Sequence, residues 1–320
     1  MVSLLRIYRS CLLALPLICG VAVADDWATR LGYPEGAKVI ILHAHDMGLC
    51  HETNQAATQL LEATPSASVS AMPPCPWFGD AAAFAASNPQ ADVGLQVTLN
   101  SEWPRYRWRP MSRGDMAGSL VDGDGYLWRS VLQVMVNATT EDVEREMRWQ
   151  LLNAERLGMK PTHLASHLGA LYSRPDLTRA YLKFAQEQWI PAVVVDLTPE
   201  MAERFARQGF PIPDGLARTL DEYPLPKLED LRIVPRTESL EEKVLGTLEL
   251  LEALPEGLSQ VAFSPAVDSP ALRAITPKWE QFAWDHQVWQ DQRVRDALAQ
   301  PNVILTNWVE VMERFDPATR

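Results

Sequence analysis

The sequence predicts an α/β fold, a single irregular (β/α) barrel, from three observations. Short apolar runs alternate with helical patterns of ten or more residues over most of the 320-residue chain. This alternation is typical of a parallel sheet with helical crossovers. No internal repeat, low-complexity tract or Gly/Ser linker divides the chain, which favours one domain. No Gly-x-Gly-x-x-Gly follows a predicted strand, so an open nucleotide-binding sheet loses its main support.

The expected elements follow one another along the whole chain. The longest helical pattern begins with the Ser/Thr-x-x-acid signature of Thr139 and Asp142 and stops at Gly158. Strands are expected at residues 38–44, 68–73, 93–99, 162–166, 191–196, 259–264 and 302–307. Helices are expected at residues 53–63, 79–87, 139–158, 175–188, 199–208, 238–254 and 278–299.

The first 24 residues have the pattern of a secretory signal peptide. Arg6 and Arg9 form a basic start, an apolar core follows, and residues 22–24 (Ala-Val-Ala) form a small-x-small cleavage pattern before Asp25. The apolar run is too short to span a membrane comfortably. We therefore expect residues 1–24 to be removed and the protein to be exported, to the periplasm or outside the cell.

Export would affect the cysteines of the domain at residues 25–320. A lipid anchor at Cys19 is disfavoured because the residues before it are not small. The mature chain would keep Cys50 and Cys75, which can pair in an oxidising compartment. The sequence leaves open whether they pair or stay as two buried thiols.

The net charge excludes some classes of partner. The chain has a formal charge of −12 at pH 7, and removal of the two signal-peptide arginines would change it to −14. An acidic exported protein is a poor candidate for binding nucleic acid or anionic lipid surfaces. Neutral or cationic ligands, sugars among them, fit better.

Polar residues gather where predicted strands end. In a barrel the carboxyl ends of the strands converge on one face, where active sites lie. Histidine and carboxylate side chains at such ends suit a divalent metal site, although no His-Glu-x-x-His or Cys-x-x-Cys signature is present. The polar residues at these ends are His43, His45, Asp46, Gln96, His163, His167, Asp196 and Ser264.

Four segments resemble, in the same order, the motifs of the YdjC-like (ChbG/HpnK-type) carbohydrate deacetylases. They are VIILHAHDMGLCHETNQA, ADVGLQVTLNSEW, PTHLASHLGALYSRP and VAFSPAVDSPALRAITPKWE. The resemblance extends from about residue 31 to residue 312. It implies a (β/α) barrel that removes acetyl groups from acetamido sugars with a divalent metal.

The first two motifs each depart from the family pattern at one residue. In Ala-Asp-Asp-x-Gly the first aspartate resembles a general base and the second binds metal. Here Asp46 matches the metal ligand, whereas His45 replaces the base. In Gly-x-His the histidine binds metal, but this chain has Gln96 there. An amide oxygen is a much poorer zinc ligand than an imidazole nitrogen.

The third and fourth motifs depart as well. In Thr-His-x-Asp-Ser-His this chain keeps His163, for which we expect a role in substrate binding, and His167, which matches a metal ligand. Ala165 replaces the aspartate and cannot orient a neighbouring histidine, a role typically worth about 10–100-fold. Ser264 replaces the histidine of His-Pro and cannot serve as a general acid near neutral pH.

Three functional hypotheses follow. The leading one is an exported homologue that has lost most or all deacetylation and still binds an acetylated sugar or oligosaccharide. The second is an active deacetylase with a rearranged site, in which His45 is the catalytic base and Asp46 and His167 hold a divalent metal (Mg or Zn). The third is a partner-binding exported protein that uses neither metal nor sugar.

An aromatic segment after the second motif is a candidate for sugar binding. Trp103 and Trp108 lie in SEWPRYRWRP, and aromatic faces beside polar groups are surfaces on which sugar rings stack. The alternative is that these side chains anchor a long loop. The sequence does not decide between the two.

Overall fold

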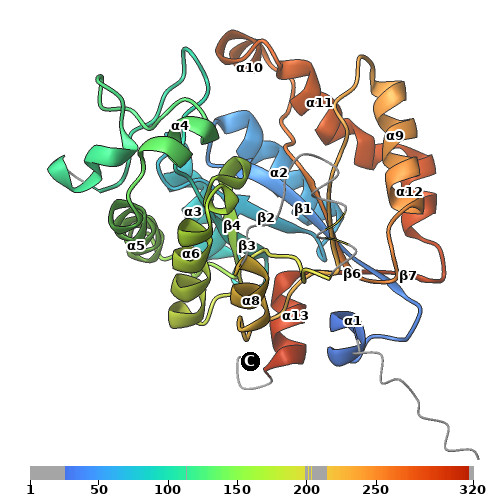
Figure 1. Ribbon diagram of the computed structural model, residues 1–320. Coiled ribbons are helices and arrows are strands. Elements are labelled where there is room, and N and C mark those ends of the chain that lie inside the picture. The colour runs from blue at the N-terminus through green and yellow to red at the C-terminus, as the bar shows by residue number, and fades with distance from the viewer. Residues whose placement is uncertain (1–25, 113, 199–200, 202, 204–214, 317–320) are drawn as a thin grey trace, which may run out of the picture.

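The protein was analysed as a computed structural model that describes residues 26–112, 114–198, 201, 203 and 215–316. The predicted signal peptide and most of the predicted helix at 199–208 lie outside these residues. Figure 1 shows a central parallel sheet surrounded by helices. Its seven strands run in the order β4-β3-β2-β1-β6-β5, and β7 also pairs with β1. The strands are β1 (Lys38–Met47), β2 (Ser68–Ala71), β3 (Asp92–Val97), β4 (Leu164–Ser166), β5 (Asp230–Ile233), β6 (Gly257–Phe263) and β7 (Val303–Thr306).

The sheet curls into an irregular barrel, as predicted. The gap between β4 and β5 is bridged by the segment at residues 191–196. Val193 N–H donates to Leu164 O at 2.8 Å, and Asp196 N–H donates to Leu228 O at 2.7 Å. This segment forms isolated bridges rather than the regular strand expected from its sequence. Backbone pairing nevertheless continues around the ring and keeps the carboxyl ends of the strands together.

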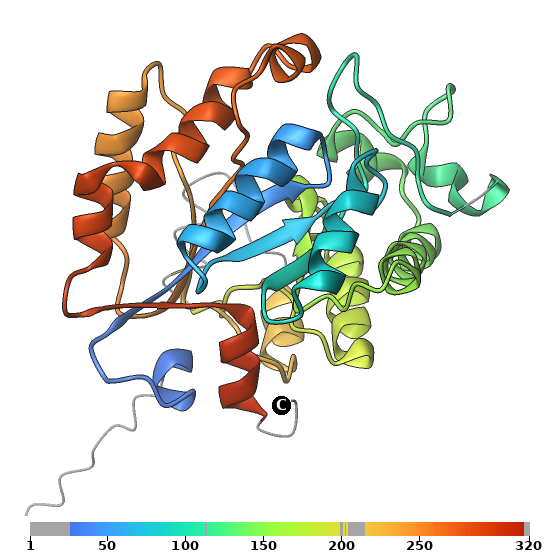
Figure 2. The same ribbon diagram turned by 180° about the vertical axis from the view of Figure 1, so that it is seen from behind.

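Helices cover the outside of the barrel in both views (Figures 1 and 2). Two of them, α1 and α13, lie near the amino ends of the strands, at the bottom of Figure 1. The α-helices are α1 (Trp27–Arg30), α2 (His51–Ala63), α3 (Phe78–Ser87), α4 (Val131–Asn137), α5 (Thr140–Arg156), α6 (Pro175–Gln188), α8 (Leu216–Asp221), α9 (Leu240–Glu252), α10 (Pro270–Ile275), α11 (Trp279–Gln287), α12 (Gln292–Leu298) and α13 (Trp308–Phe315). Three 3-10 helices join them: η1 (Gly114–Leu120), η2 (His167–Tyr172) and η3 (Val288–Gln290).

Helix α5 forms for the reasons that its sequence suggests. The Thr139 hydroxyl accepts a hydrogen bond from the backbone N–H of Asp142, which caps the first turn. Val143, Met147 and Leu151 recur at helical spacing and are buried, so one face of α5 packs on the barrel.

The prediction of one long helix at residues 278–299 is wrong in detail. The chain forms α11, η3 and α12 instead. Asp291 is extended (ψ 133°), and its carboxylate accepts the backbone N–H of Arg293 at 2.8 Å. This N-cap starts a new helix, because an aspartate competes well for the free N–H groups of a first turn.

The amino end of the barrel is filled with apolar side chains. Val39 and Ile41 of β1 and Leu258 of β6 belong to one buried cluster, together with Trp308 and Val311 of α13. Because strand side chains alternate between faces, His43 and His45 continue the inward row that Val39 and Ile41 begin. The interior therefore changes from apolar to polar toward the carboxyl ends.

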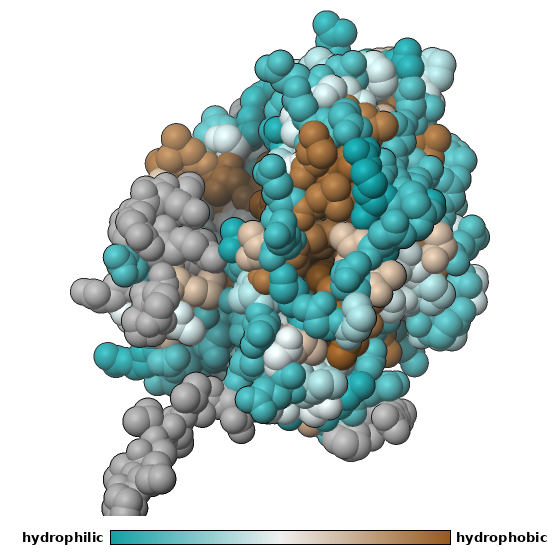
Figure 3. Space-filling model, turned by 90° about the vertical axis from the view of Figure 1, so that its right-hand side faces the viewer, coloured by the Kyte–Doolittle hydropathy of each residue, from teal (hydrophilic) through white to brown (hydrophobic). Residues whose placement is uncertain are grey.

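A cavity lies on the outer side of the sheet. A cavity of about 320 Å³ between α9, α12 and the first residues of β1 and β7 is lined largely by Ile40, Leu248, Leu251, Leu298 and Val303. Figure 3 shows the side of the molecule that carries α9 and α12, with apolar surface exposed between hydrophilic residues. Within the described part of the chain, no helix has both the length and the apolar character needed to cross a membrane.

Candidate functional site

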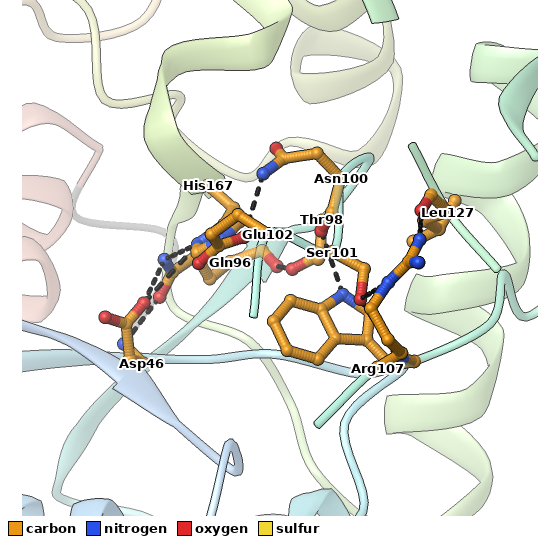
Figure 4. A network of polar contacts seen from close by, with 10 residues as sticks. Asp46, Gln96, Thr98, Asn100, Ser101, Glu102, Arg107, Leu127 and His167 are labelled. Atoms are coloured by element: carbon orange, nitrogen blue, oxygen red, sulfur yellow. Dashed lines mark hydrogen bonds and ion pairs between the residues drawn. The ribbon is translucent and has the colours of Figure 1, made fainter. Parts of the chain in front are cut away.

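The candidate site lies where β1, β3 and β4 end. Asp46 is on β1, Gln96 is on β3, and His167 directly follows β4. Figure 4 shows Gln96 between Asp46 and His167, with Glu102 on the far side of His167. The three residues that the first three motifs place at a metal centre therefore do meet, as their strand-end positions suggested.

The orientation of the Gln96 amide is set by its oxygen. Oε1 accepts the backbone N–H of Asp46 at 2.7 Å and the Ser70 hydroxyl at 3.2 Å. The amide nitrogen consequently faces the carboxylate of Asp46, with Nε2 to Oδ1 at 2.8 Å. The same nitrogen lies 2.9 Å from Nδ1 of His167. A neutral amide group thus bridges the two predicted metal ligands.

Asp46 has an unusual backbone. Its φ of +69° lies in the left-handed region, which costs a residue with a side chain about 1–3 kcal/mol. Gln96 binds both the backbone N–H and the carboxylate of this residue, and so holds the strained conformation in place. Gly48 (φ +87°) completes the turn, where a Cβ would lie 3.2 Å from Phe78 Cα.

His167 is held between two carboxylates. Its Nε2 lies 3.1 Å from Oε2 of Glu102, and its Nδ1 lies 3.4 Å from Oδ1 of Asp46. Burial disfavours the charged imidazole, but Glu102 and Asp46 outweigh it and raise the pKa of His167 to about 10. The Gln96 amide instead favours the neutral imidazole of His167, because its N–H can pair only with an Nδ1 that carries a lone pair.

The two neighbouring groups of β1 differ in charge. Burial lowers the pKa of His45 to about 4, so its imidazole is neutral at pH 7. For Asp46, burial favours the neutral acid, but the hydrogen bond and charge of His167 prevail and hold the pKa below its usual range. Nε2 of His45 is buried without a hydrogen-bond partner among the described residues. The predicted base position therefore carries a neutral imidazole beside an ionised carboxylate.

His163 does not lie where a substrate could touch it. The residue is 0% exposed, with Nε2 at 3.0 Å from Nε2 of His43 and Nδ1 at 3.1 Å from Oδ1 of Asp92. A Cβ added at Gly94 would lie 2.4 Å from the His163 ring. The structure gives His163 a place in the barrel interior, in contrast to the predicted role in substrate binding.

The end of β6 carries an ion pair that the sequence did not indicate. The backbone N–H of Ser264 donates to Oδ2 of Asp285 at 2.9 Å, and Lys243 pairs with the other oxygen of the same carboxylate. Burial raises the pKa of Asp285 to about 6, and Lys243 opposes this effect. Lys243 and Asp285 belong to α9 and α11, so no local pattern links them to the site.

Trp103 and Trp108 are more buried than a sugar-stacking role would require. They are 6% and 2% exposed. The indole N–H of Trp108 donates to Asn100 O at 2.9 Å, and Trp103 packs edge-on against Phe282 at 5.5 Å between ring centroids. These contacts agree with the alternative that both rings anchor the loop. Sugar stacking on them stays a prediction.

A pocket beside the site presents an exposed aromatic side chain, whereas Trp103 and Trp108 are buried. It has a volume of about 350 Å³, and Trp77, which flanks it, is 41% exposed. It is lined by Cys50, His51, Glu52, Trp77, Tyr106, Ala271 and Ile275, from the loops after β1, β2 and β3 and from helices α2 and α10, which follow β1 and β6. The pocket therefore belongs to the same face as the site. Sequence reasoning missed it because Trp77 stands alone between two predicted elements.

Cys50 and Cys75 are free thiols in the structure, and both are buried. Burial raises the pKa of Cys50 to about 11. These thiols are therefore protonated and poorly nucleophilic at neutral pH.

The donor set does not fit a divalent metal ion of the kind implied by the resemblance. Among residues 26–112, 114–198 and 215–316, no group of three or more His, Cys, Asp or Glu side chains is placed to share an ion. At the position between Asp46 and His167, Gln96 presents an N–H group, which repels a cation, and its oxygen is already bound by Asp46 N–H. A third protein ligand is therefore missing.

Comparison with known proteins identifies the family. The family described as YdjC-like protein matches residues 39–300. The chain belongs to the YdjC-like family. It is 35% identical to a carbohydrate deacetylase of Thermus thermophilus over 277 residues, 86% of this chain and 94% of that protein. It is also 24% identical to a carbohydrate deacetylase of Thermoanaerobacter pseudethanolicus, over 85% and 98% of the two chains.

A solved structure supports the same fold. A cellobiose-phosphate cleavage protein of Enterococcus faecalis V583 superposes with a TM-score of 0.66 at 20% identity, covering 85% of this chain and 98% of that one. The barrel predicted from the sequence is thus also the fold of that protein.

Proposed function

We propose that this YdjC-like protein binds carbohydrate and has lost metal-dependent deacetylation. The observation that carries the proposal is the Gln96 amide, whose Nε2 donates to Asp46 Oδ1 at 2.8 Å and lies 2.9 Å from His167 Nδ1. In such a site the acetyl carbonyl of a substrate would meet no Lewis acid, and Ala165 and Ser264 supply no acid–base group.

The pocket next to the site supports the carbohydrate-binding part of the proposal. Its volume of about 350 Å³ falls within the range of small-molecule sites. Trp77 and Tyr106 bring aromatic surface to it, and Glu52 brings a carboxylate. Aromatic faces with a few polar groups bind the apolar faces and hydroxyl groups of sugar rings.

Two measurements on the mature protein test the proposal. The first follows acetate release from chitin oligosaccharides in the presence of Zn²⁺, Mg²⁺ or Ni²⁺. The second measures binding of the same oligosaccharides by calorimetry. We expect no acetate above a protein-free control, and saturable binding that weakens in Trp77→Ala.

The outcomes separate the three hypotheses. Acetate release that disappears in His45→Asn and in Asp46→Ala would establish the rearranged active site and overturn the proposal. Absence of both acetate release and sugar binding would leave the partner-binding hypothesis. Trp189→Ala is a matched control for Trp77→Ala, since Trp189 is 46% exposed and lies at the end of α6.

We also propose that the protein is exported after cleavage before Asp25. The support is the basic, apolar and small-residue pattern of residues 1–24. Mass spectrometry of the protein from cell fractions is expected to find a chain that begins at Asp25 outside the cytoplasm. A full-length chain in the cytoplasm would contradict export.

A further inference from the structure

The pocket that flanks the candidate site has a buried carboxylate in its wall, that of Glu52. Glu52 is 7% exposed, and its Oε1 accepts the hydroxyl of Ser269 at 2.5 Å. Burial favours the neutral acid, but hydrogen bonds from Ser269 and from the backbone N–H of Glu52 itself prevail and hold the pKa of Glu52 below its ordinary value. The wall of the pocket therefore carries a negative charge at neutral pH.

No lysine or arginine lines the pocket to balance this charge. The seven described residues that line it include neither type, and His51 is the one lining side chain that can become a cation by taking up a proton. Arg273 lies on α10 between two lining residues, but its guanidinium binds both oxygens of Asp268, at 2.8 and 2.6 Å. An anion in the pocket would therefore find no free guanidinium or ammonium group among these lining residues.

The amino end of α2 borders the same pocket and already holds an anion. The free N–H groups at the amino end of a helix attract anions such as phosphate. Glu52 lies in the first turn of α2, and its carboxylate accepts its own backbone N–H. The backbone N–H of Cys50 donates to Oγ1 of Thr53 at 3.1 Å. A phosphate group would have to compete with a carboxylate that belongs to the helix itself.

The polar atoms that remain in the pocket suit hydroxyl groups. The hydroxyl of Tyr106 donates its hydrogen to Leu49 O at 3.0 Å, so its oxygen is left as an acceptor. An ionised carboxylate has about four lone-pair positions, so Glu52 can accept further hydrogen bonds. A sugar hydroxyl can donate to either group, whereas an ionised phosphate brings further acceptors and further negative charge.

We propose that Glu52 makes this pocket select neutral, unphosphorylated saccharides and exclude sugars that carry a phosphate or carboxylate group. A neutral sugar can stack on Trp77 and donate hydroxyl hydrogens to Glu52 without charge repulsion. An anionic group would lose its water shell beside a like charge and the apolar side chains of Ala271 and Ile275. The inference rests on the proposed carbohydrate binding and specifies which class of saccharide is bound.

Calorimetry with a matched pair of sugars tests the inference. N,N′-diacetylchitobiose and its phosphate monoester at the primary hydroxyl of the non-reducing sugar are compared at about pH 8. At this pH an imidazole side chain of ordinary pKa is neutral, and the phosphate carries about two negative charges. We expect the unphosphorylated disaccharide to bind at least about tenfold more tightly.

Three substitutions separate the local charge of the pocket from the net charge of the protein. Glu52→Gln keeps an oxygen that can accept from Ser269 and removes the charge. It is expected to reduce the preference for the unphosphorylated sugar at least about threefold. Glu62→Gln and Glu35→Gln each remove an exposed carboxylate, from the far end of α2 and from the turn before β1, and should leave the preference unchanged.

A charge added at the rim of the pocket provides an independent test, which does not depend on the stability of Glu52→Gln. Ala271→Lys adds a cation at an exposed lining position of α10 and should strengthen binding of the phosphorylated sugar at least about threefold. Ala274→Lys adds the same charge at an exposed position of α10 that is not among the lining residues. It should change this binding less than about twofold, because solvent and salt screen an exposed charge.

The failures of the two proposals are distinguishable. Equal or tighter binding of the phosphorylated sugar by the wild type would overturn this inference and leave carbohydrate binding intact. A preference that is unchanged in both Glu52→Gln and Ala271→Lys would do the same. Binding of neither sugar would overturn both proposals.

Discussion

Gln96 contacts three residues of the site, and its removal should therefore affect stability. Gln96→Leu leaves the backbone N–H and the carboxylate of Asp46 without these hydrogen bonds in a buried position. We expect the free energy of unfolding to fall by about 2–4 kcal/mol, measured by urea denaturation. Ser70→Ala removes only one contact, at 3.2 Å, and should cost less than about 1.5 kcal/mol. A Gln96→Leu protein as stable as the wild type would show that the amide does not hold Asp46.

Gly94 provides a second test at the scale of one residue. A Cβ at this position would lie 2.4 Å from Nε2 of His163, on a fully buried ring. Gly94→Ala is expected to cost about 1–3 kcal/mol because the close contact forces His163 and His43 to move. Gly79→Ala is the matched control, since nothing lies within 4 Å of a Cβ there, in helix α3. It should be neutral or stabilise the protein by up to about 1 kcal/mol. Thermal unfolding of both variants checks the pair, and equal stability would contradict the packing account.

At the residue scale, the sequence predicted which side chains meet at the candidate site better than it predicted what each of them does there. Asp46, Gln96 and His167 meet because parallel strands place their carboxyl ends together. The sequence predicted Gln96 as a weakened ligand, whereas the structure shows that it also bridges its neighbours. That role depends on the Asp46 backbone turning its N–H toward the amide, and a φ value cannot be read from residue types. His163 was misplaced because a strand-end histidine can face the packed interior as well as the mouth.

At the scale of elements, the alternation of short apolar segments with helical patterns predicted the strands and helices reliably. Strands β1, β3 and β6 and helices α5 and α6 were all predicted within a few residues. The prediction of one helix at residues 278–299 was wrong because a single internal N-cap residue, Asp291, is a weaker sequence signal than a helical pattern that continues past it. Strand β5 was missed because two of its four residues, Asp230 and Arg232, are charged, so no apolar run marks it in the sequence.

Helix α1 is attached to the barrel through a half-buried carboxylate, that of Glu229, whose charge state depends on pH. Glu229 accepts the backbone N–H of Trp27 at 2.6 Å and that of Leu258 at 2.5 Å. Burial raises the pKa of Glu229 from 4.5 to about 7. Because the folded state binds the proton more tightly, this contribution is fully present below pH 4.5 and is lost as the pH rises through 7.

Glu229→Gln should therefore change the pH dependence of stability. The wild type is expected to lose about 2–3 kcal/mol between pH 5 and pH 8 relative to the variant, since one pKa unit corresponds to about 1.4 kcal/mol. Urea denaturation of both proteins across this range measures the difference. Glu35→Gln should run parallel to the wild type. Parallel curves for wild type and Glu229→Gln would show that Glu229 titrates normally.

At the scale of the whole molecule, the chain retains the fold and much of the sequence of its family. The chain keeps 35% identity with a carbohydrate deacetylase over most of its length, and the same sheet brings the motif residues together. We propose that the residues at four motif positions, His45, Gln96, Ala165 and Ser264, remove groups that metal-assisted hydrolysis requires. Fold and family could therefore be predicted from the sequence, whereas the loss of activity is a proposal that depends on the site.

The central claim is that Gln96 stands where a metal ligand is needed. The most direct measurement is the zinc content of the purified wild type and of Gln96→His after incubation with Zn²⁺ and gel filtration, by atomic emission. We expect the wild type to retain almost none. Gln96→His, with Asp46 and the histidines at 96 and 167 as ligands, should retain about one ion per chain, and Asp46→Ala in that background should lose it. One zinc ion per wild-type chain that depends on Asp46 and His167 would contradict the account.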